Sequence, residues 1–183
     1  MKTLIRILLF GCLSMLLIAC SGKTAQDNQD VVDGEETAAS AEEQLAPTAE
    51  LLDLNNEVLN TATIDKPILY SFWASWCNYC QEEIPQINEL YAKYGDQVEF
   101  VSVNITHNDT LDGAKKFISE KSLTMPVYFD IDGIASTKFG VLAVPTIVLV
   151  DGEGRFVERK VGPSNEGDIE RIIESLEQVA QGS

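Results

Sequence analysis

Segments suited to buried strands alternate with amphipathic helical segments from residue 68 to the end of the chain. The first strand-like segment, Ile68–Trp73, is apolar or aromatic at every position except Ser71. Such a run is typical of a strand covered on both faces. A helical pattern over 78–94 follows and stops before Gly95. This alternation predicts an α/β sandwich, in which helices cover a central sheet.

The remaining elements of the predicted domain, residues 48–183, continue the same alternation. We expect strands at 98–103, 126–130, 146–150 and 155–161, and helices at 111–121, 134–139 and 165–181. The last two strands flank a turn at 151–154 and are predicted to pair as an antiparallel hairpin. A domain of roughly 140 residues can bury about two-thirds of its unfolded surface, so it needs no metal or disulfide on grounds of size.

The first 19 residues have the pattern of a secretory signal peptide. Two basic residues precede an apolar run over 7–19, which is too short to span a membrane comfortably. The run ends in LIAC at 17–20, which resembles a bacterial lipobox, where the chain is cut before the cysteine and the cysteine carries the lipid. This resemblance implies an extracytoplasmic lipoprotein, on the outer face of the cell membrane or in the periplasm, anchored to the bilayer through Cys20. An uncleaved membrane anchor is the alternative.

The chain is strongly acidic, and residues 20–47 contribute much of the charge. This segment has many acidic residues, a single lysine and no aromatic residue. It cannot bury enough apolar surface to offset the entropy of ordering it. We therefore expect a disordered tether, with an acidic surface helix over 37–45 as the alternative. The net charge of the whole chain is −16, which repels phosphate, so we expect no nucleic-acid partner.

Two of the four cysteines are candidates for redox chemistry. Cys12 lies in the signal segment and Cys20 at its end, which leaves Cys77 and Cys80. Two intervening residues suit either a redox dithiol or half of a zinc site. A zinc site would need two more nitrogen or sulfur ligands, but the domain has only His107 and no third cysteine. We therefore expect no metal and no other cofactor. A static structural disulfide stays as an alternative, although so short a loop removes little chain entropy.

Cys77 falls between a buried strand and a helix. Unpaired N–H groups and the helix dipole stabilise negative charge at a helix N-terminus, and the thiolate is the nucleophile in disulfide exchange. Cys80 follows one turn later and is expected to lie underneath, less exposed than Cys77. These positions predict that Cys77 attacks a substrate disulfide and that Cys80 resolves the mixed disulfide.

The sequence FWASWCNYC at 72–80, followed by Glu83 and Pro85, resembles the thioredoxin superfamily and, more narrowly, the TlpA/ResA-type thiol-disulfide oxidoreductases. The likeness runs from residue 46 to the final helix and includes VPT at 144–146, which matches the family's cis-proline loop. It also includes the helix and strand over 109–130 that separate this subgroup from plain thioredoxin. The resemblance implies a thioredoxin-like three-layer sandwich with a central mixed sheet, flanking helices and this insertion.

The resemblance also implies a substrate-binding surface beside the dithiol. It is made of Trp76, Val144 and Pro145, with Pro145 in the cis form and Trp76 partly exposed next to the sulfur. Val144 would then face the dithiol and leave its backbone groups free to pair with an extended substrate segment. A trans proline that begins a strand is the alternative.

Glu83 is the candidate proton carrier for the resolving cysteine. It lies three residues after Cys80 and so shares a helical face with it. Ser71 stands where plain thioredoxin has a buried aspartate, which leaves Glu83 as the nearest acid to move a proton to or from Cys80. A solvated carboxylate, like the neighbouring Glu82, is the alternative.

The chain as a whole is predicted to be an extracytoplasmic thiol-disulfide oxidoreductase. The resemblance implies that it reduces disulfides of exported proteins, with apocytochrome c as the leading substrate. It also implies recharging by a membrane thiol-disulfide transporter of the CcdA/DsbD kind. Two alternatives stay open: a thiol peroxidase-like antioxidant enzyme, and a non-catalytic binding lipoprotein with a structural disulfide.

Overall fold

The structure, a computed structural model, describes residues 44–182. The predicted signal peptide, Cys20 and most of the predicted tether lie outside these residues. The described strands are β1 (Glu50–Leu52), β2 (Val58–Asn60), β3 (Ile68–Trp73), β4 (Glu99–Asn104), β5 (Val127–Phe129), β6 (Thr146–Val150) and β7 (Phe156–Val161). The helices are α1 (Asn78–Tyr94), α2 (Leu111–Glu120), α3 (Ile134–Lys138) and α4 (Glu166–Gly182), with 3-10 turns η1 (Thr61–Thr63) and η2 (Thr106–Asn108).

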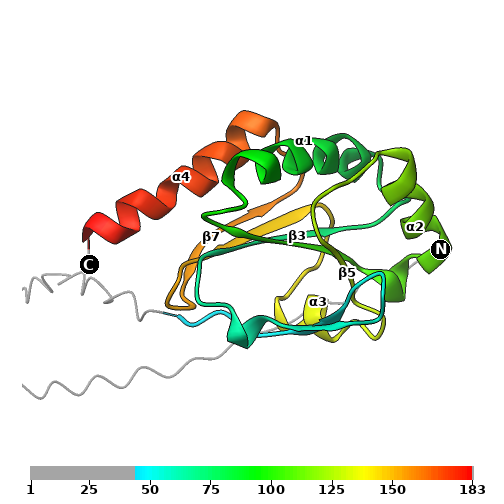
Figure 1. The fold of residues 1–183 in the computed structure, drawn as a ribbon, viewed down its shortest axis with the longest axis horizontal. Helices are drawn as coiled ribbons and strands as arrows, with labels where there is room; N and C mark the ends of the chain where they lie inside the picture. The colour runs from blue at the N-terminus through cyan, green and yellow to red at the C-terminus, as the bar shows by residue number, and fades with distance from the viewer. Residues whose placement is uncertain (1–43, 183) are drawn as a thin grey trace, which may run out of the picture. The chain divides into compact units, whose positions relative to one another are not determined.

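The seven strands form one mixed sheet in the order β2-β1-β5-β4-β3-β6-β7. β3 runs parallel to β4 and antiparallel to β6, and β6 pairs with β7 as the predicted antiparallel hairpin. Helices lie on both faces of this sheet, α1 and α4 on one and α3 on the other (Figure 1). The predicted fold class, a three-layer thioredoxin-like sandwich with a mixed sheet, is confirmed.

The predicted strands and helices are all present, with bounds that differ by a residue or so at several ends. The β1–β2 hairpin was not predicted, because strands of three residues carry too little periodicity to be recognised. Its turn is organised by Asp53, whose Oδ1 accepts hydrogen bonds from the backbone N–H groups of Asn55 at 2.7 Å and Glu57 at 2.8 Å. Asn56 completes the turn with a φ of 62°, a conformation that asparagine tolerates better than most residues.

Aromatic packing on both faces of β3 holds this strand in place. Its six residues are all buried. Tyr70 and Phe72 contact Phe139, at the end of α3, with ring centroids 4.5 Å and 5.4 Å apart. Trp73 contacts Phe117 of α2 with centroids 5.0 Å apart. These contacts therefore fix the position of the end of β3, where the turn into α1 begins.

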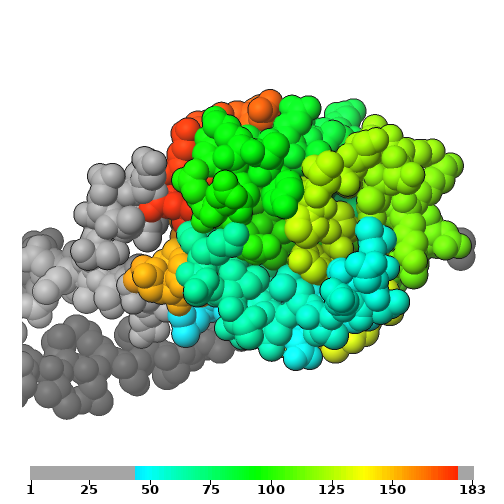
Figure 2. Space-filling model, viewed as in Figure 1, coloured from blue at the N-terminus to red at the C-terminus, as the bar shows by residue number. Residues whose placement is uncertain are grey.

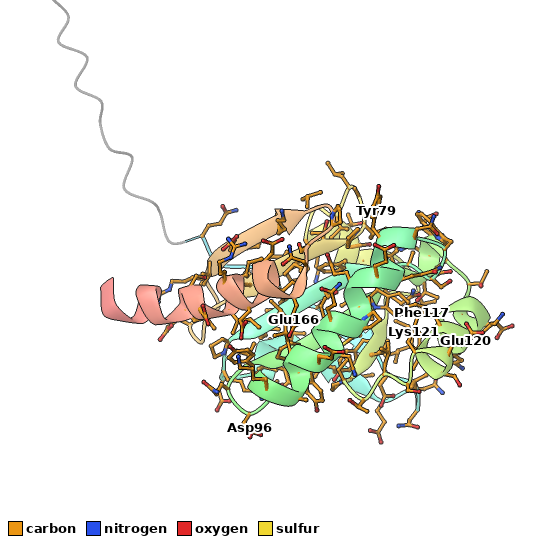
Figure 3. The ribbon with its side chains drawn as sticks, turned by 90° about the horizontal axis from the view of Figure 1, so that it is seen from above. Tyr79, Asp96, Phe117, Glu120, Lys121 and Glu166 are labelled. Atoms are coloured by element: carbon orange, nitrogen blue, oxygen red, sulfur yellow. The ribbon has the colours of Figure 1, made fainter. Side chains whose placement is uncertain are left out.

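α1 and α4 pack side by side on their face of the sheet. The backbone N–H of Glu166, the first residue of α4, donates to Gln86 Oε1 at 2.6 Å, and Lys93 forms an ion pair with Glu170. Figure 3 shows Glu166 beside the middle of α1, with Tyr79 near one end of that helix. The space-filling view shows α1 and α4 adjoining along the upper edge and α2 at the right-hand end (Figure 2).

Ordered pairing of the described chain begins before the predicted domain boundary at residue 48. Leu45 forms an isolated antiparallel bridge with Arg155, and the N–H of Ala46 donates to the carbonyl of Gly154 at 2.8 Å. Residues 44–46, at the end of the predicted tether, thus pair with the turn between β6 and β7 and with the start of β7. Within residues 44–182, none of the helices is long and apolar enough to cross a membrane.

Candidate active site

The dithiol occupies the turn from β3 into α1. Cys77 is the N-cap residue of α1, and its Sγ accepts a hydrogen bond from the backbone N–H of Cys80 at 3.2 Å. Both cysteines are free thiols. Cys77 is 6% exposed and Cys80 is fully buried, which confirms that the second cysteine is the less accessible. Cys77 is nevertheless itself a buried residue, while its neighbours Trp76 and Tyr79 are exposed.

The loop before β6 lies directly against the first sulfur. The Val144–Pro145 peptide bond is cis, as predicted. Cys77 Sγ lies 3.6 Å from the carbonyl oxygen of Val144, within reach of a hydrogen bond from the thiol. The loop is held from both sides, because the Pro145 carbonyl accepts from the N–H of Gly162 at 2.9 Å and Thr146 Oγ1 donates to the carbonyl of Ala143 at 2.7 Å. The structure thus brings Val144 and Pro145 to the dithiol.

An open cavity of about 140 Å³ lies beside this contact. Its lining is of mixed polarity: Trp76, Ile105, His107, Asn108, Ser136, Val141, Leu142, Ala143 and Val144. Trp76 is 55% exposed, and its indole Nε1 donates to the carbonyl of Asn108 at 2.8 Å. Leu142 is 99% exposed. Next to the nucleophile the protein therefore offers a surface of mixed polarity, in which the Trp76 indole is held in a defined orientation.

Glu83 is buried beneath the dithiol and is 1% exposed, so the solvated alternative is wrong, although Glu82 is exposed as expected. Glu83 Oε2 accepts the backbone N–H of Ser164 at 2.7 Å, whereas Oε1 has no hydrogen-bond partner among the described residues. Burial raises the pKa of Glu83 to about 7, although Ser164 and the positive charge of Lys160 oppose the shift. This carboxyl can hold or release a proton near neutral pH.

The environment of Cys80 disfavours its thiolate. Burial raises the pKa of Cys80, and the nearby Cys77 sulfur and Glu83 raise it further. In β3, Ser71 is also buried, and its hydroxyl has no hydrogen-bond partner within residues 44–182. Cys80 therefore needs a proton acceptor before it can attack. Glu83 is an ionisable group close enough for its negative charge to raise the pKa of Cys80.

No group of three His, Cys, Asp or Glu side chains that could hold a metal ion occurs in the described part of the chain. His107 belongs to η2, and its Nδ1 lies 3.8 Å from Asp130 Oδ2. It lines the cavity next to the dithiol.

One residue of this region was missed from the sequence. Asp109, in the connection between η2 and α2, accepts hydrogen bonds from both the backbone N–H and the hydroxyl of Ser75, two residues before Cys77. No local pattern connects the two positions, because 34 residues separate them in the chain.

Comparison with known proteins agrees with this geometry. A family model described as Redoxin matches residues 41–176. The thiol-disulfide oxidoreductase ResA of Geobacillus thermodenitrificans is 31% identical over 96% of this chain and 99% of its own, and that of Bacillus thuringiensis subsp. konkukian is 28% identical over 72% and 76%. A thiol:disulfide interchange protein of the thioredoxin family from Chlorobium tepidum shares the fold, with a TM-score of 0.68 and 22% identity over 75% of this chain and 99% of that one. The chain therefore belongs to the Redoxin family, as a thiol-disulfide oxidoreductase related to ResA.

Proposed function

We propose that the Cys77/Cys80 dithiol reduces disulfides of exported proteins outside the cytoplasm. One observation carries this proposal: Cys77 Sγ caps α1, accepts the N–H of Cys80 at 3.2 Å and lies 3.6 Å from the carbonyl of Val144. A sulfur at a helix N-terminus is favoured as an anion. Once the thiol is ionised it no longer donates to the Val144 carbonyl, which then gives a polypeptide substrate a hydrogen-bonding edge at the reacting atom.

In the first step Cys77 acts as the nucleophile. Its thiolate attacks one sulfur of the substrate disulfide, the substrate S–S bond breaks, and a mixed disulfide with Cys77 forms. The displaced substrate sulfur leaves as a thiolate and takes a proton from solvent. The substrate chain pairs with Val144, and one of its side chains enters the cavity beside Trp76.

In the second step Cys80 releases the substrate. Glu83 in its ionised form accepts the thiol proton of Cys80 through Oε1, the oxygen that has no partner among residues 44–182. The Cys80 thiolate then attacks Cys77 Sγ in the mixed disulfide, which forms the Cys77–Cys80 disulfide and frees the second substrate thiolate. Two electrons pass from the dithiol to the substrate, so the protein must be reduced again before the next cycle.

The proposed location follows from the N-terminal sequence. The apolar run over 7–19 and the LIAC sequence at 17–20 support secretion and a lipid anchor on Cys20. Lipid must provide the attachment, because the net charge of −16 opposes binding to anionic headgroups. Cysteines are readily oxidised outside the cytoplasm, which is where a reductant is needed.

The proposed partners follow from the similarity to ResA-type proteins. Apocytochrome c is the leading substrate, and a membrane thiol-disulfide transporter of the CcdA/DsbD kind would return electrons to the Cys77–Cys80 disulfide. A strain that carries Cys77→Ser and Cys80→Ser together tests this assignment. Loss of cytochrome c assembly supports it, whereas normal assembly would discard apocytochrome c as the substrate.

An insulin reduction assay with dithiothreitol as electron source tests the activity itself. We expect turnover by the wild-type chain and none above background for Cys77→Ser. Absence of wild-type turnover would contradict the proposal and favour a binding lipoprotein. Stopped-flow mixing of the reduced protein with hydrogen peroxide separates the peroxidase alternative, because rapid sulfenate formation at Cys77 would favour that class.

A further inference from the structure

The carboxylate of Asp109 receives four hydrogen bonds. Its Oδ2 accepts the backbone N–H of Ser75 at 2.6 Å and the side-chain amide of Asn104 at 2.8 Å. Its Oδ1 accepts the hydroxyl of Ser75 and the N–H of Thr110, both at 2.7 Å. Burial acts to raise the pKa of Asp109, but these donors together lower it below its ordinary value. Asp109 is therefore ionised at neutral pH, with each oxygen accepting from two donors.

Ser75 is held through all of its polar groups. Besides the two bonds to Asp109, its carbonyl accepts the side-chain amide of Gln81 at 2.7 Å. α2 approaches so closely that a Cβ atom on Gly113 would lie 2.8 Å from Ser75 Oγ. Glycine therefore makes the approach of this helix to Ser75 possible.

The last residue of η2, directly before Asp109, also holds Trp76. Asn108, which precedes Asp109, accepts the indole N–H of Trp76 at 2.8 Å through its backbone carbonyl. The two residues immediately before Cys77 are thus bonded to two consecutive residues, Asn108 at the end of η2 and Asp109 after it. Ser75 is held through its backbone N–H and its hydroxyl, and Trp76 is held through its indole N–H, while its side chain stays exposed.

We propose that Asp109 is a positioning residue that holds the Ser75–Trp76 segment so that Cys77, the indole and Val144 together present one docking edge to a polypeptide disulfide. This inference rests on the proposed function and adds to it a residue outside the Cys-x-x-Cys turn. A small disulfide needs only the Cys77 sulfur, whereas a polypeptide must contact the sulfur, the indole and the Val144 carbonyl at once. Asp109 therefore affects exchange with polypeptides far more than exchange with small molecules.

An amide cannot accept from all four donors of this carboxylate. Each oxygen of Asp109 faces a backbone N–H, one from Ser75 and one from Thr110. The NH₂ group of an asparagine would therefore point at a donor in either orientation. Asp109→Asn therefore keeps the size of the side chain, removes its negative charge and leaves at least one of these two backbone N–H groups facing another donor. Asp112→Asn is the matched control, because Asp112 is exposed in the first turn of α2 and the substitution makes the same change in charge.

The test compares rate constants of the reduced full chain with insulin and with hydroxyethyl disulfide. For Asp109→Asn we expect at least a tenfold lower rate with insulin and a rate within twofold of wild type with hydroxyethyl disulfide. Asp112→Asn should match wild type with both. Ser75→Ala, which removes only the hydroxyl donor, should shift the insulin rate in the same direction by a smaller factor. This second variant keeps the test valid if Asp109→Asn does not fold.

Two results would overturn the positioning role: unchanged rates with both disulfides, or equal losses with both in a protein that unfolds at the wild-type temperature. If Asp109→Asn does not fold, an unchanged insulin rate in Ser75→Ala overturns it. A wild-type chain that reduces neither disulfide would instead contradict the proposed function, and the positioning role with it. The wild-type rates thus test the proposed reductase activity, and the variant rates test the role of Asp109.

Discussion

Cys77 Sγ lies 3.6 Å from the carbonyl oxygen of Val144, a residue 67 positions later in the chain. The contact joins the N-terminus of α1 to the loop before β6, and each of these segments is fixed by its own hydrogen bonds. It places an acceptor for a substrate N–H beside the sulfur that attacks. The reactive atom and the edge that would hold a peptide therefore belong to a single site.

Replacing Glu83 should change how disulfide exchange depends on pH. Burial raises the pKa of Glu83 to about 7, so in the wild type we expect the resolution rate to rise through neutral pH as the carboxyl ionises and can accept the Cys80 proton. Glu83→Gln should flatten this rise and slow resolution by roughly 10²-fold. Stopped-flow kinetics across neutral pH provides the measurement, and Glu82→Gln, at the exposed neighbour, is the control. A pH profile in Glu83→Gln that matches the wild type removes the proposed proton transfer.

Stability of the reduced protein should fall as the pH rises through neutral. The pKa of Glu83 increases from 4.5 to about 7 on folding, so the native state binds the proton more tightly than the unfolded chain. The stabilisation is complete below the unfolded pKa and is lost as pH rises through the folded one, by about 3 kcal/mol at most. Urea unfolding at about pH 5 and about pH 8 measures the difference. Glu83→Gln should largely abolish it, and an equal loss in that variant contradicts the assignment.

Gly113→Ala should destabilise the protein although alanine favours helices. The added Cβ would lie 2.7 Å from Thr110 Oγ1 and 2.8 Å from Ser75 Oγ. Overpacking of this kind costs about 1–3 kcal/mol, which exceeds the gain of about 1 kcal/mol in helix propensity. Gly167→Ala in α4 is the control, because its Cβ would lie 3.4 Å from the nearest atom, Asn165 Oδ1, which is an ordinary van der Waals distance. Chemical denaturation should show a loss for the first variant and not for the second; a gain at Gly113 would be inconsistent with the close approach of α2.

Phe139→Ala should remove a large part of the stability of the fold. The ring lies between Tyr70 and Phe72 with centroids 4.5 Å and 5.4 Å away, and truncation of a buried phenylalanine costs about 3–5 kcal/mol. Leu142→Ala, at a side chain that is 99% exposed, should change the free energy of unfolding by less than about 0.5 kcal/mol. Similar losses for the two variants would mean that this part of the core is assigned incorrectly.

Local sequence patterns were sufficient for the parts of the fold that form continuous elements. The apolar run of β3, the helical spacing of α1 and the Cys-x-x-Cys junction between them all appear in consecutive residues. The cis form of Pro145 was expected from the resemblance of VPT at 144–146 to a family motif, and it is present. The β1–β2 hairpin was missed because its strands are too short to show a period.

The features of the site that could not be predicted from the sequence depend on contacts between residues far apart in the chain. Glu82 and Glu83 are adjacent and identical, and helical spacing alone suggested that Glu83 would face Cys80. Its burial and its bond to the N–H of Ser164, 81 residues away, depend on the loop before α4. The positioning role of Asp109 likewise depends on its hydrogen bonds to Ser75, 34 residues away in the chain.

Trapping of the mixed disulfide shows directly which of the two sulfurs attacks the substrate. The full-chain Cys80→Ser and Cys77→Ser variants are each mixed with a peptide disulfide at neutral pH and analysed by mass spectrometry without reductant. We expect Cys80→Ser to accumulate an adduct on Cys77, because the resolving sulfur is gone, and Cys77→Ser to accumulate almost none on the buried Cys80. An adduct that forms as readily on Cys80, or no adduct on Cys77, would contradict the proposed roles of the two cysteines.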